Sequence, residues 1–508
     1  MMKNTIPFML VALLAAQAAP AATLPVELGG IKPLDSRGRK FAPIKYKIEE
    51  GPAADPPVDL QNLTKDQLEA AARFLAPDPS DPPKNLSPYL VYRLMDVLAK
   101  VDMNYKRPIP QAEWDRRLQE MKDEFVKKNG TPGGEERSAQ QWEQSVDEMI
   151  SGLVDKLDDP HTRYMPREEA KRYAEEMKGS FGGVGASLEK VDEGVRLTVV
   201  YPGSPAEKAG LVSGDVVTAV DGAPTKGRDL KDVVGRLRGP EGSPVEIRVT
   251  RLDRPVTVTR AAIRTPDLFA KMAAPGVGYV YFSQFRPAVD ARLFAKIDEL
   301  KRMGAVKLII DLRDNPGGLL AMADSIASEF LQDRDVIVTT KRQGRLATKA
   351  VTEGPGRFFG MPLAVLVNNG SASASEILAA ALQEHGRAVV VGSQSYGKGS
   401  FQLAMPTQVP VIHPSGIVVN SRGDGTLIKV TEGGWYTPQD RSVEGRHDPA
   451  AGHNVPGSGG VTPDEAVTVS PEDETKVLVG INDQLFGRGA GAASDPALEK
   501  AVEVLNRR

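Results

Sequence analysis

Cysteine is absent from this sequence of 508 residues. Its absence excludes disulfide bonds, thiol catalysis, lipid attachment at a cysteine and every cysteine-based metal site. Histidine is scarce, and none of the five histidines forms the HExxH pattern of zinc hydrolases. They are His161, His385, His413, His447 and His453. We therefore expect neither a metal ion nor an organic cofactor.

A large excess of charge of one sign is also missing. The formal net charge is −3, with 41% hydrophobic and 26% charged residues, which is typical of a globular protein. A general nucleic-acid binder has a marked basic excess, so we expect no nucleic-acid partner. A chain of this length is too long to fold around a single hydrophobic core, so we expect two to four domains.

The one long apolar run lies at the N-terminus. Lys3 precedes an apolar segment that ends in the small-residue pattern Ala19-Pro20-Ala21, which is typical of a secretory signal peptide over residues 1–22. An uncleaved anchor or a buried helix is the alternative, but the run is short for a membrane span. We therefore expect an exported protein, periplasmic or extracellular, with no integral membrane span after signal cleavage.

Composition and periodicity divide the rest of the chain into five regions. Residues 23–85 are an arm rich in proline and charge, and residues 86–178 have the apolar spacing of helices. Residues 179–263 contain short β-branched runs between turns. Residues 264–470 alternate strands and helices. Residues 471–508 are a helical tail, whose amphipathic last helix is expected to dock on its own domain or on a partner.

The alternating region predicts where functional residues gather. Continuous apolar strands are expected at 306–313, 362–369 and 388–392, with helices near 319–330 and at 375–385. Such strands belong to a sheet that helices cover on both faces. Function in these sheets gathers where the strands end.

One strand end carries a serine-rich turn, GSASASEI at 370–377. A serine there lies at a helix N-terminus, where free backbone amides favour developing negative charge. Its small neighbours let a substrate carbonyl approach the backbone. The alternative is an ordinary helix-capping serine. Ser371, Ser373 and Ser375 are the candidate nucleophiles of this turn, and the family resemblance described below selects Ser373.

A lysine in SYGKGSFQ (395–402) is the candidate base. Lys398 lies 25 positions after Ser373 (398 minus 373). A lysine acts as a base when burial lowers its pKa from about 10.4 to roughly 7–8, and the glycine and aromatic neighbours of Lys398 suit this. Gln402 lies on the same side of an extended segment. The alternative is a solvated surface lysine.

The glycine pair that ends DLRDNPGG (311–318) offers candidate oxyanion donors. Acyl transfer needs two such donors, and the backbone N–H groups of Gly318 and Ala374 are our candidates, with Gly317 as the alternative to Gly318. Taken alone, the segment is more typical of a tight strand-to-helix turn capped by Asn315.

The histidines leave a competing mechanism open. His385 ends the helix that starts at the serine turn, about eleven residues of ~1.5 Å rise away, so it is remote from Ser373 and expected to be a helix C-terminal charge. Spacing allows a Ser/His/Asp triad with His413, His447 or His453. Their glycine- and proline-rich surroundings indicate surface residues.

Together these motifs resemble the carboxyl-terminal processing proteases, also called tail-specific proteases. The resemblance covers roughly residues 86–469 in the family's order. Its motifs are LDDPHTRYM (157–165), FGGVGA (181–186), GSPAEKAGLVSGDVVTAVDG (203–222), DLRDNPGG, NNGSASASEILAAALQEHGRAVVVGSQSYGKGSFQ (368–402), WYTPQDRSVEG (435–445) and GVTPDEAV (460–467).

The resemblance implies a multidomain α/β fold, with a crotonase-like α/β protease core at 264–470, an inserted β-rich PDZ domain at 179–263 and an N-terminal helical region. It also implies a serine endopeptidase. In this reading Ser373 is the nucleophile, Lys398 the general base and Gln402 its orienting partner, while the oxyanion amides fall at Gly318 and Ala374.

For the PDZ module, the resemblance implies that the amides of Gly182, Gly183, Val184 and Gly185 bind the terminal carboxylate of a peptide, which adds as a strand. The expected partners are protein or peptide substrates with exposed C-terminal tails. A second copy of the chain or an adaptor protein is left open. The alternative for this segment is a glycine-rich hairpin without a ligand.

Three features depart from the family pattern. Residues 447–460 look like an insertion that shapes a substrate channel or a contact. The arm at 23–85 has no recognised counterpart, and Asp314 stands where asparagine is usual.

Overall fold

The structure is a computed structural model that describes residues 88–106, 109–129, 138–157, 159–264, 266–342, 345–412, 418–448, 453–455, 457–486 and 494–507. The predicted signal peptide (1–22), the proline-rich arm (23–85) and His413 lie outside these residues. Within the described residues, no helix has the length and apolar character needed to cross a membrane.

The described residues form two compact units. The first holds the residues up to Arg172, Arg334–Thr352 and Lys398–Arg446; the second holds Tyr173–Asp333, Glu353–Gly397 and the residues from His447 onward. Ser373 and Lys398 therefore belong to different units, and the chain passes from one unit to the other just before Lys398.

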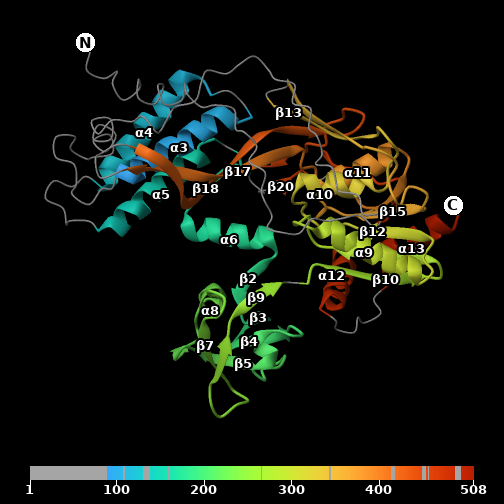
Figure 1. The fold of residues 1–508 in the computed structure, drawn as a ribbon, viewed down its shortest axis with the longest axis horizontal. Helices are drawn as coiled ribbons and strands as arrows, with labels where there is room; N and C mark the ends of the chain where they lie inside the picture. The colour runs from blue at the N-terminus through green and yellow to red at the C-terminus, as the bar shows by residue number, and fades with distance from the viewer. Residues whose placement is uncertain are drawn as a thin grey trace. The chain divides into compact units, whose positions relative to one another are not determined.

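Three helices of the first unit share an apolar core. They are α3 (Pro88–Asn104), α4 (Gln111–Asn129) and α5 (Ala139–Asp155) (Figure 1). A capping box starts α5: the Gln141 N–H donates to Ser138 Oγ at 3.3 Å, and the Ser138 N–H donates to Gln141 Oε1 at 2.7 Å. Trp142, Val146 and Ile150 lie on one face of α5 and are buried, as expected for an amphipathic helix.

A long antiparallel ribbon completes the first unit. Its sheet has the order β1-β18-β13-β14, and β17 pairs with β18. The strands are β1 (Arg163–Met165), β13 (Val336–Arg342), β14 (Arg345–Val351), β17 (Ser400–Ile412) and β18 (Val418–Tyr436). Ile428 and Val430 of β18 join the helical core. The ribbon that starts just after Lys398 is therefore anchored on the helices.

A buried arginine also ties these elements together. Arg93 of α3 is 2% exposed and forms ion pairs with Glu143 at 2.8 Å and Asp147 at 2.7 Å, both on α5. It also pairs with Asp424 of β18. Because a buried cation is costly unless it is paired, the three carboxylates fix where helices and ribbon meet.

The β-rich module of the second unit follows α6 (Arg167–Lys178), which spans the boundary of the units. One sheet has the order β3-β4-β5-β7-β8 with β6 beside β5, and β2 pairs with β9. The elements are β2 (Ser180–Gly183), β3 (Ala186–Val191), β4 (Gly194–Val200), α7 (Pro205–Lys208), β5 (Val216–Val220), β6 (Ala223–Pro224), α8 (Leu230–Leu237), β7 (Pro244–Val249), β8 (Val256–Thr259) and β9 (Ala261–Arg264). The terminal strand β3 leaves one edge of this sheet unpaired by any described strand.

The rest of the second unit is an α/β sheet of order β10-β11-β12-β15-β16-β21, parallel except for the β10–β11 pair. The sheet and its helices are β10 (Leu268–Ala274), β11 (Val277–Phe282), α9 (Val289–Arg302), β12 (Lys307–Asp311), α10 (Leu320–Ser328), β15 (Leu363–Val367), α11 (Ala374–Glu384), β16 (Ala388–Gly392), β21 (Glu465–Ala466), α12 (Pro471–Leu485) and α13 (Pro496–Asn506). Two further strands, β19 (His447–Asp448) and β20 (His453–Asn454), form a separate two-stranded sheet. The strands and helices expected in this region are all observed.

Helices cover both faces of this sheet, as the apolar strands predict. On one face, Ile309 and Leu366 share a core with Ala501 and Leu505 of α13. α9 packs against β10 and β11, and α11 packs against β16 (Figure 1). The last helix therefore docks on its own domain, one of the two outcomes expected from the sequence.

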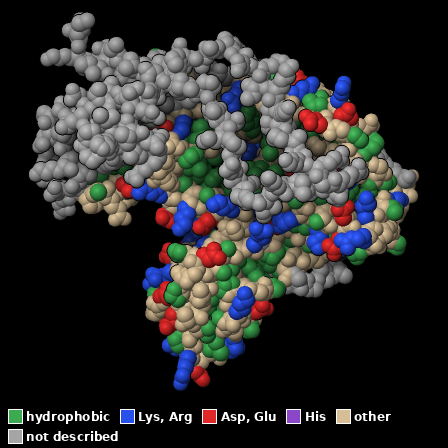
Figure 2. Space-filling model, viewed as in Figure 1, with side chains coloured by type: hydrophobic (Ala, Val, Ile, Leu, Met, Phe, Trp, Pro, Cys, Tyr) green, Lys and Arg blue, Asp and Glu red, His purple; other side chains and the backbone are tan. Residues whose placement is uncertain are grey.

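Charged side chains of both signs are visible on the face of the molecule seen in Figure 2. On the face seen in Figure 2, Lys and Arg side chains lie interspersed with Asp and Glu side chains. This distribution agrees with the formal net charge of −3.

Candidate active site

The serine turn connects β15 to α11 with an unusual backbone. Ser373, immediately before α11, has φ 56° and ψ −115°. Such a positive φ is uncommon for residues with a side chain and is kept only where surrounding contacts impose it. The contact here is a hydrogen bond of 2.8 Å from the Ser373 N–H to Glu376 Oε2.

The three serines of the turn differ in their surroundings. Ser371 and Ser375 are 0% exposed. Their hydroxyls donate to backbone carbonyls, Ser371 to Leu312 and Ser375 to Asn315, each at 2.7 Å. Ser373 is partly exposed. The two alternatives therefore hold the turn together, and Ser373 is the serine that solvent can reach.

The glycine turn lies directly against the serine turn. Gly317 has φ +95°, and a Cβ there would lie 2.8 Å from the Ala374 backbone nitrogen, so only glycine permits this approach. The Gly317 N–H donates to Asn315 Oδ1 at 3.0 Å. Its amide is therefore already used, which favours Gly318 of the two glycines as an oxyanion donor. Asn315 thus closes the turn from within, whereas the N-cap of the following helix α10 is Leu319, which makes no side-chain capping hydrogen bond.

Asp314 adopts a conformation that explains its residue type. Its φ is 52°, in the left-handed region that Asn and Asp tolerate better than other residues with side chains. Aspartate can therefore replace the asparagine usual in the family without changing the backbone. Its side chain accepts a 3.4 Å hydrogen bond from Asn368.

Glu376 is the residue of the site that sequence reasoning missed. Its side chain is 0% exposed and accepts hydrogen bonds from the Ser373 N–H (2.8 Å), the Ser395 hydroxyl (2.6 Å) and the Gly397 N–H (2.7 Å). One carboxylate thus joins the serine turn to the peptide that precedes Lys398. Its sequence signal is its place three residues after the helix N-cap, the capping-box position.

The predicted insertion at 447–460 contacts the same peptide. β19 and β20 form a short antiparallel ladder within it. The Asn454 Nδ2 group donates to the carbonyls of Gly397 (2.7 Å) and Tyr396 (3.3 Å). The described part of this segment thus contacts the backbone that leads to the lysine.

Lys398 lies in the first unit and is half-buried. Its carbonyl accepts a 2.8 Å hydrogen bond from Trp435 Nε1, and the Trp435 N–H donates to the Gly399 carbonyl. A Cβ on Gly399 would come within 2.7 Å of the Glu444 nitrogen. A buried tryptophan and a close backbone approach therefore fix the chain on the C-terminal side of the lysine.

Gln402, on β17, is oriented by hydroxyl groups. Its Nε2 donates to Ser400 Oγ at 3.2 Å and to Thr431 Oγ1 at 3.5 Å. With the amide N–H groups used in this way, the Gln402 side-chain oxygen remains as an acceptor.

The LDDPHTRYM motif contacts strand β18 in the first unit. Thr162 Oγ1 donates to Asp159 at 3.0 Å and accepts from the Thr431 N–H at 3.0 Å. Burial lowers the pKa of His161 to about 4, and the positive charge of Lys398 acts in the same direction. His161 is therefore neutral at pH 7 and lies close enough to Lys398 to feel its charge.

The remaining predicted residues are placed as follows. His385 is the C-cap residue of α11, so the expected position at a helix end is confirmed. His447 and His453 lie in the β19–β20 ladder. In the β-rich module, Gly182 and Gly183 end β2, and Val184 and Gly185 form its connection to β3. Among the described residues, no group of three or more His, Asp or Glu is arranged to hold a metal ion.

Two family models match the chain. Peptidase family S41 matches residues 276–467, which include the serine turn and Lys398, and the PDZ domain matches residues 196–251. A solved structure titled photosystem II D1 C-terminal processing protease covers 80% of this chain and 100% of its own, with 25% identity and a TM-score of 0.44.

Curated relatives are processing proteases. The chain is 32% identical over 321 residues to a probable CtpA-like serine protease of Staphylococcus saprophyticus, covering 63% of this chain and 60% of that protein. For the carboxy-terminal processing protease CtpA of Bacillus subtilis the identity is 33% over 297 residues, covering 58% and 60%. The chain thus spans 60% of the length of each of these two relatives.

The carboxy-terminal-processing protease of Bartonella bacilliformis is 32% identical over 308 residues, covering 59% of this chain and 67% of that protein. This alignment, together with the two matched models, confirms the resemblance seen in the motifs. The chain belongs to peptidase family S41 and contains a PDZ domain.

Proposed function

We propose that the protein is an exported serine endopeptidase that binds C-terminal tails of protein substrates at its PDZ domain and cleaves peptide bonds through a Ser/Lys acyl-enzyme mechanism. The observation that carries this proposal is the strained, partly exposed Ser373 at the N-terminus of α11, pressed against the glycine turn. A helix N-terminus and a glycine turn in contact supply backbone N–H groups where an oxyanion develops.

In the proposed reaction, Ser373 Oγ attacks the scissile carbonyl while a neutral Lys398 Nζ takes the hydroxyl proton. The N–H groups of Gly318 and Ala374 stabilise the oxyanion. The lysine returns the proton to the leaving amine, and water then hydrolyses the acyl-enzyme. Gln402 orients the lysine through its amide oxygen, a role supported by the hydroxyl contacts of its Nε2.

The unpaired edge of the PDZ sheet supports tail recognition. β3 is the terminal strand of its sheet, and α8 packs near it. An extended tail adds to such an edge by backbone hydrogen bonds. Its carboxylate would meet the amides of Gly182, Gly183, Val184 and Gly185, which immediately precede β3. Protein or peptide tails are thus the proposed substrates.

Several finer features belong to the same proposal. We infer a crotonase-like core, supported by the mixed sheet and its covering helices. The signal peptide at 1–22, the domain limits at 86–178, 179–263 and 264–470, and a periplasmic or extracellular location stay predictions. A second copy or an adaptor protein also stays open as a partner.

The test uses an unfolded substrate that ends in an apolar tail, with mass spectrometry of the products. Ser373→Ala and Lys398→Ala are each expected to lower turnover by roughly four orders of magnitude, with thermal unfolding unchanged. Near-wild-type turnover in either variant would contradict the mechanism. Tail binding by the wild-type protein without any fragments would indicate a PDZ scaffold in place of a peptidase.

A further inference from the structure

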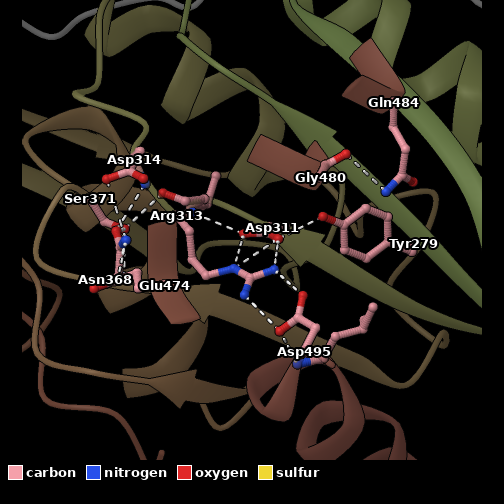
Figure 3. Close-up of polar contacts among 12 residues, drawn as sticks. Tyr279, Asp311, Arg313, Asp314, Asn368, Ser371, Glu474, Gly480, Gln484 and Asp495 are labelled. Carbon is pink, nitrogen blue, oxygen red and sulfur yellow. Dashed lines mark hydrogen bonds and ion pairs between the residues drawn. The ribbon is translucent and has the colours of Figure 1, made fainter. Parts of the chain in front are cut away.

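The two C-terminal helices contact the catalytic turns although they lie beyond the residues matched by the peptidase family. That match ends at residue 467, whereas α12 begins at Pro471 and α13 at Pro496. Each helix places one carboxylate near its N-terminus, Glu474 in α12 and Asp495 as the N-cap of α13 (Figure 3). Both carboxylates belong to the same compact unit as the serine turn.

Asp495 forms a bidentate ion pair with Arg313 of the DLRDNPGG segment. Arg313 Nη1 and Nη2 donate to the two Asp495 oxygens, each at 2.8 Å. The other side of the guanidinium bonds Asp311, with Nε at 3.0 Å from both oxygens. Arg313 is 5% exposed and Asp311 is 0% exposed. Arg313 lies between the end of β12 and the glycine turn, and its guanidinium group is held between two carboxylates.

Tyr279 of the neighbouring strand β11 bonds the same Asp311 carboxylate that Arg313 bonds. Its hydroxyl donates to Asp311 Oδ2 at 2.6 Å (Figure 3). Burial, and then the Asp311 carboxylate, raise the pKa of Tyr279 well above its ordinary value, so the hydroxyl keeps its proton. With Asp311 fixed by Tyr279, the position of Arg313 depends on its outer partner, Asp495.

Glu474 acts on the second catalytic turn through Asn368. The Asn368 side-chain oxygen accepts from the Asp314 N–H (2.9 Å) and from the Gly370 N–H (3.0 Å), so one amide joins the glycine turn to the serine turn. Its Nδ2 donates to Glu474 Oε1 at 2.8 Å. A carboxylate only accepts hydrogen bonds, so Glu474 holds the Asn368 oxygen toward the two backbone N–H groups.

The docking of α13 does not depend on these polar contacts. Ala497, Ala501, Val504 and Leu505 bury the apolar face of the helix against the sheet. A buried ion pair adds little net stability over apolar packing, because desolvation offsets the attraction, although removing one partner alone is destabilising. The apolar face therefore accounts for the docking of α13. The two carboxylates instead bond Arg313 and Asn368, the residues that connect to the glycine turn and the serine turn.

We propose that Asp495 and Glu474 are positioning residues for catalysis. Acting through Arg313 and Asn368, they hold the glycine turn and the serine turn in register, so that the C-terminal helices set the alignment of the oxyanion amides with Ser373. This role rests on the proposed peptidase function. It assigns a catalytic task to a segment outside the matched family residues.

The experiment compares variants of the full chain. Asp495→Asn removes the charge but keeps the helix cap, since Asn caps helices about as well as Asp. Glu474→Ala removes the acceptor for Asn368. Glu499→Gln and Glu472→Gln are matched controls, because both are exposed glutamates in the first turns of α13 and α12. Three quantities are measured: kcat and KM on the unfolded substrate, the rate of Ser373 labelling by a fluorophosphonate, and thermal unfolding.

We expect Asp495→Asn and Glu474→Ala each to lower kcat and the labelling rate roughly ten- to hundredfold. KM should stay close to the wild type, whereas the unfolding temperature should fall modestly, because each variant removes one acceptor from a buried donor. The variants should remain folded under the assay conditions, and both controls should behave as the wild type. Wild-type labelling and turnover in both variants would overturn the positioning role, as would a loss that merely follows the unfolded fraction. If the wild-type protein neither labels nor cleaves, the peptidase function itself fails, and the positioning role falls with it.

Discussion

The serine turn and the lysine strand are held by different kinds of contact. On the serine side, the fully buried Glu376 accepts three hydrogen bonds of 2.6–2.8 Å. On the lysine side, Gln402 is held by hydroxyls at 3.2 and 3.5 Å, and Trp435 donates to the Lys398 carbonyl. Short bonds to a buried carboxylate are stronger than long bonds between neutral groups.

This difference in hydrogen bonding fits the roles proposed for Ser373 and Lys398. In the proposed reaction, Ser373 and the amides of Gly318 and Ala374 meet a developing charge at fixed positions, and a misplacement of about 1 Å can cost roughly a hundredfold in rate. A lysine that accepts and returns a proton moves during the cycle and needs orientation more than immobility. We therefore expect substitutions of the residues that support Ser373 to cost more activity than substitutions of the residues that support Lys398.

Among these supporting residues, the largest effect is expected for Glu376→Gln. The amide of glutamine would turn N–H donors toward backbone N–H groups and leave buried donors without an acceptor. We expect kcat to fall at least roughly hundredfold and the free energy of unfolding to fall by about 3 kcal/mol, measured by Ser373 labelling and by urea unfolding. Glu384→Gln, at the other end of α11, is the control. Normal Ser373 labelling in Glu376→Gln would contradict the expectation that the contacts on the serine side matter more for activity than those on the lysine side.

Asp324 is a buried carboxylate that, unlike Glu376, has no hydrogen-bond partner among the described residues. We therefore expect its charged form to destabilise the fold. Both oxygens of Asp324 on α10 lack a hydrogen-bond partner among the described residues, and burial raises its pKa from an ordinary 3.8 to about 7. The unfolded chain releases this proton near pH 4 and the folded protein keeps it, so stability falls as the pH rises from about 4 to about 7.

Asp324→Asn should remove this pH dependence. The shift corresponds to about 4 kcal/mol at most, and because the amide also lacks partners we expect a gain of about 2 kcal/mol at pH 8 and little gain at pH 4. Urea unfolding at both pH values measures this. An equal effect at pH 4 and pH 8 would show that Asp324 does not titrate as its burial predicts.

A smaller effect is expected where the insertion contacts the loop before the lysine. Asn454→Ala removes two hydrogen bonds to the carbonyls of Tyr396 and Gly397, and we expect kcat to fall roughly tenfold with Ser373 labelling reduced to a similar extent. Ser458→Ala, in the same insertion, should leave turnover at the wild-type level. Equal turnover in both variants would limit the insertion to a structural role.

The smallest effect is expected on the lysine side. Thr431→Val keeps the shape of the side chain but removes the hydroxyl that contacts Gln402, so kcat should fall only a few-fold, roughly the worth of one neutral hydrogen bond. Thr431→Ser should restore the rate because it keeps the hydroxyl. A loss as large as that of Glu376→Gln would reverse the comparison.

Much of the α/β core could be predicted because its signals are local. Apolar runs such as those of β12, β15 and β16 are long enough to identify buried strands, and the turns after them carry the candidate residues. Spacing alone could not choose among Ser371, Ser373 and Ser375, because all three lie in one small-residue turn. Their hydrogen bonds and exposure separate them, and these depend on which carbonyls the folded chain brings near.

Long-range partners could not be predicted for a similar reason. Nothing in the order of residues links Glu376 to Gly397, Asn454 to the same peptide, or Asp495 to Arg313, because each pair meets only after the sheet and its helices have packed. The choice between Gly317 and Gly318 depends on the same kind of information, since the amide of Gly317 is used by Asn315.

The sequence by itself determined the family, the mixed α/β character, the presence of a PDZ module and the motifs that carry the proposed chemistry, because these depend on residue types at short spacing. Only the tertiary structure decided which serine is accessible, which glycine amide is already used and which distant carboxylates hold the turns. Contacts between residues far apart in the chain depend on packing, and packing is a property of the folded molecule.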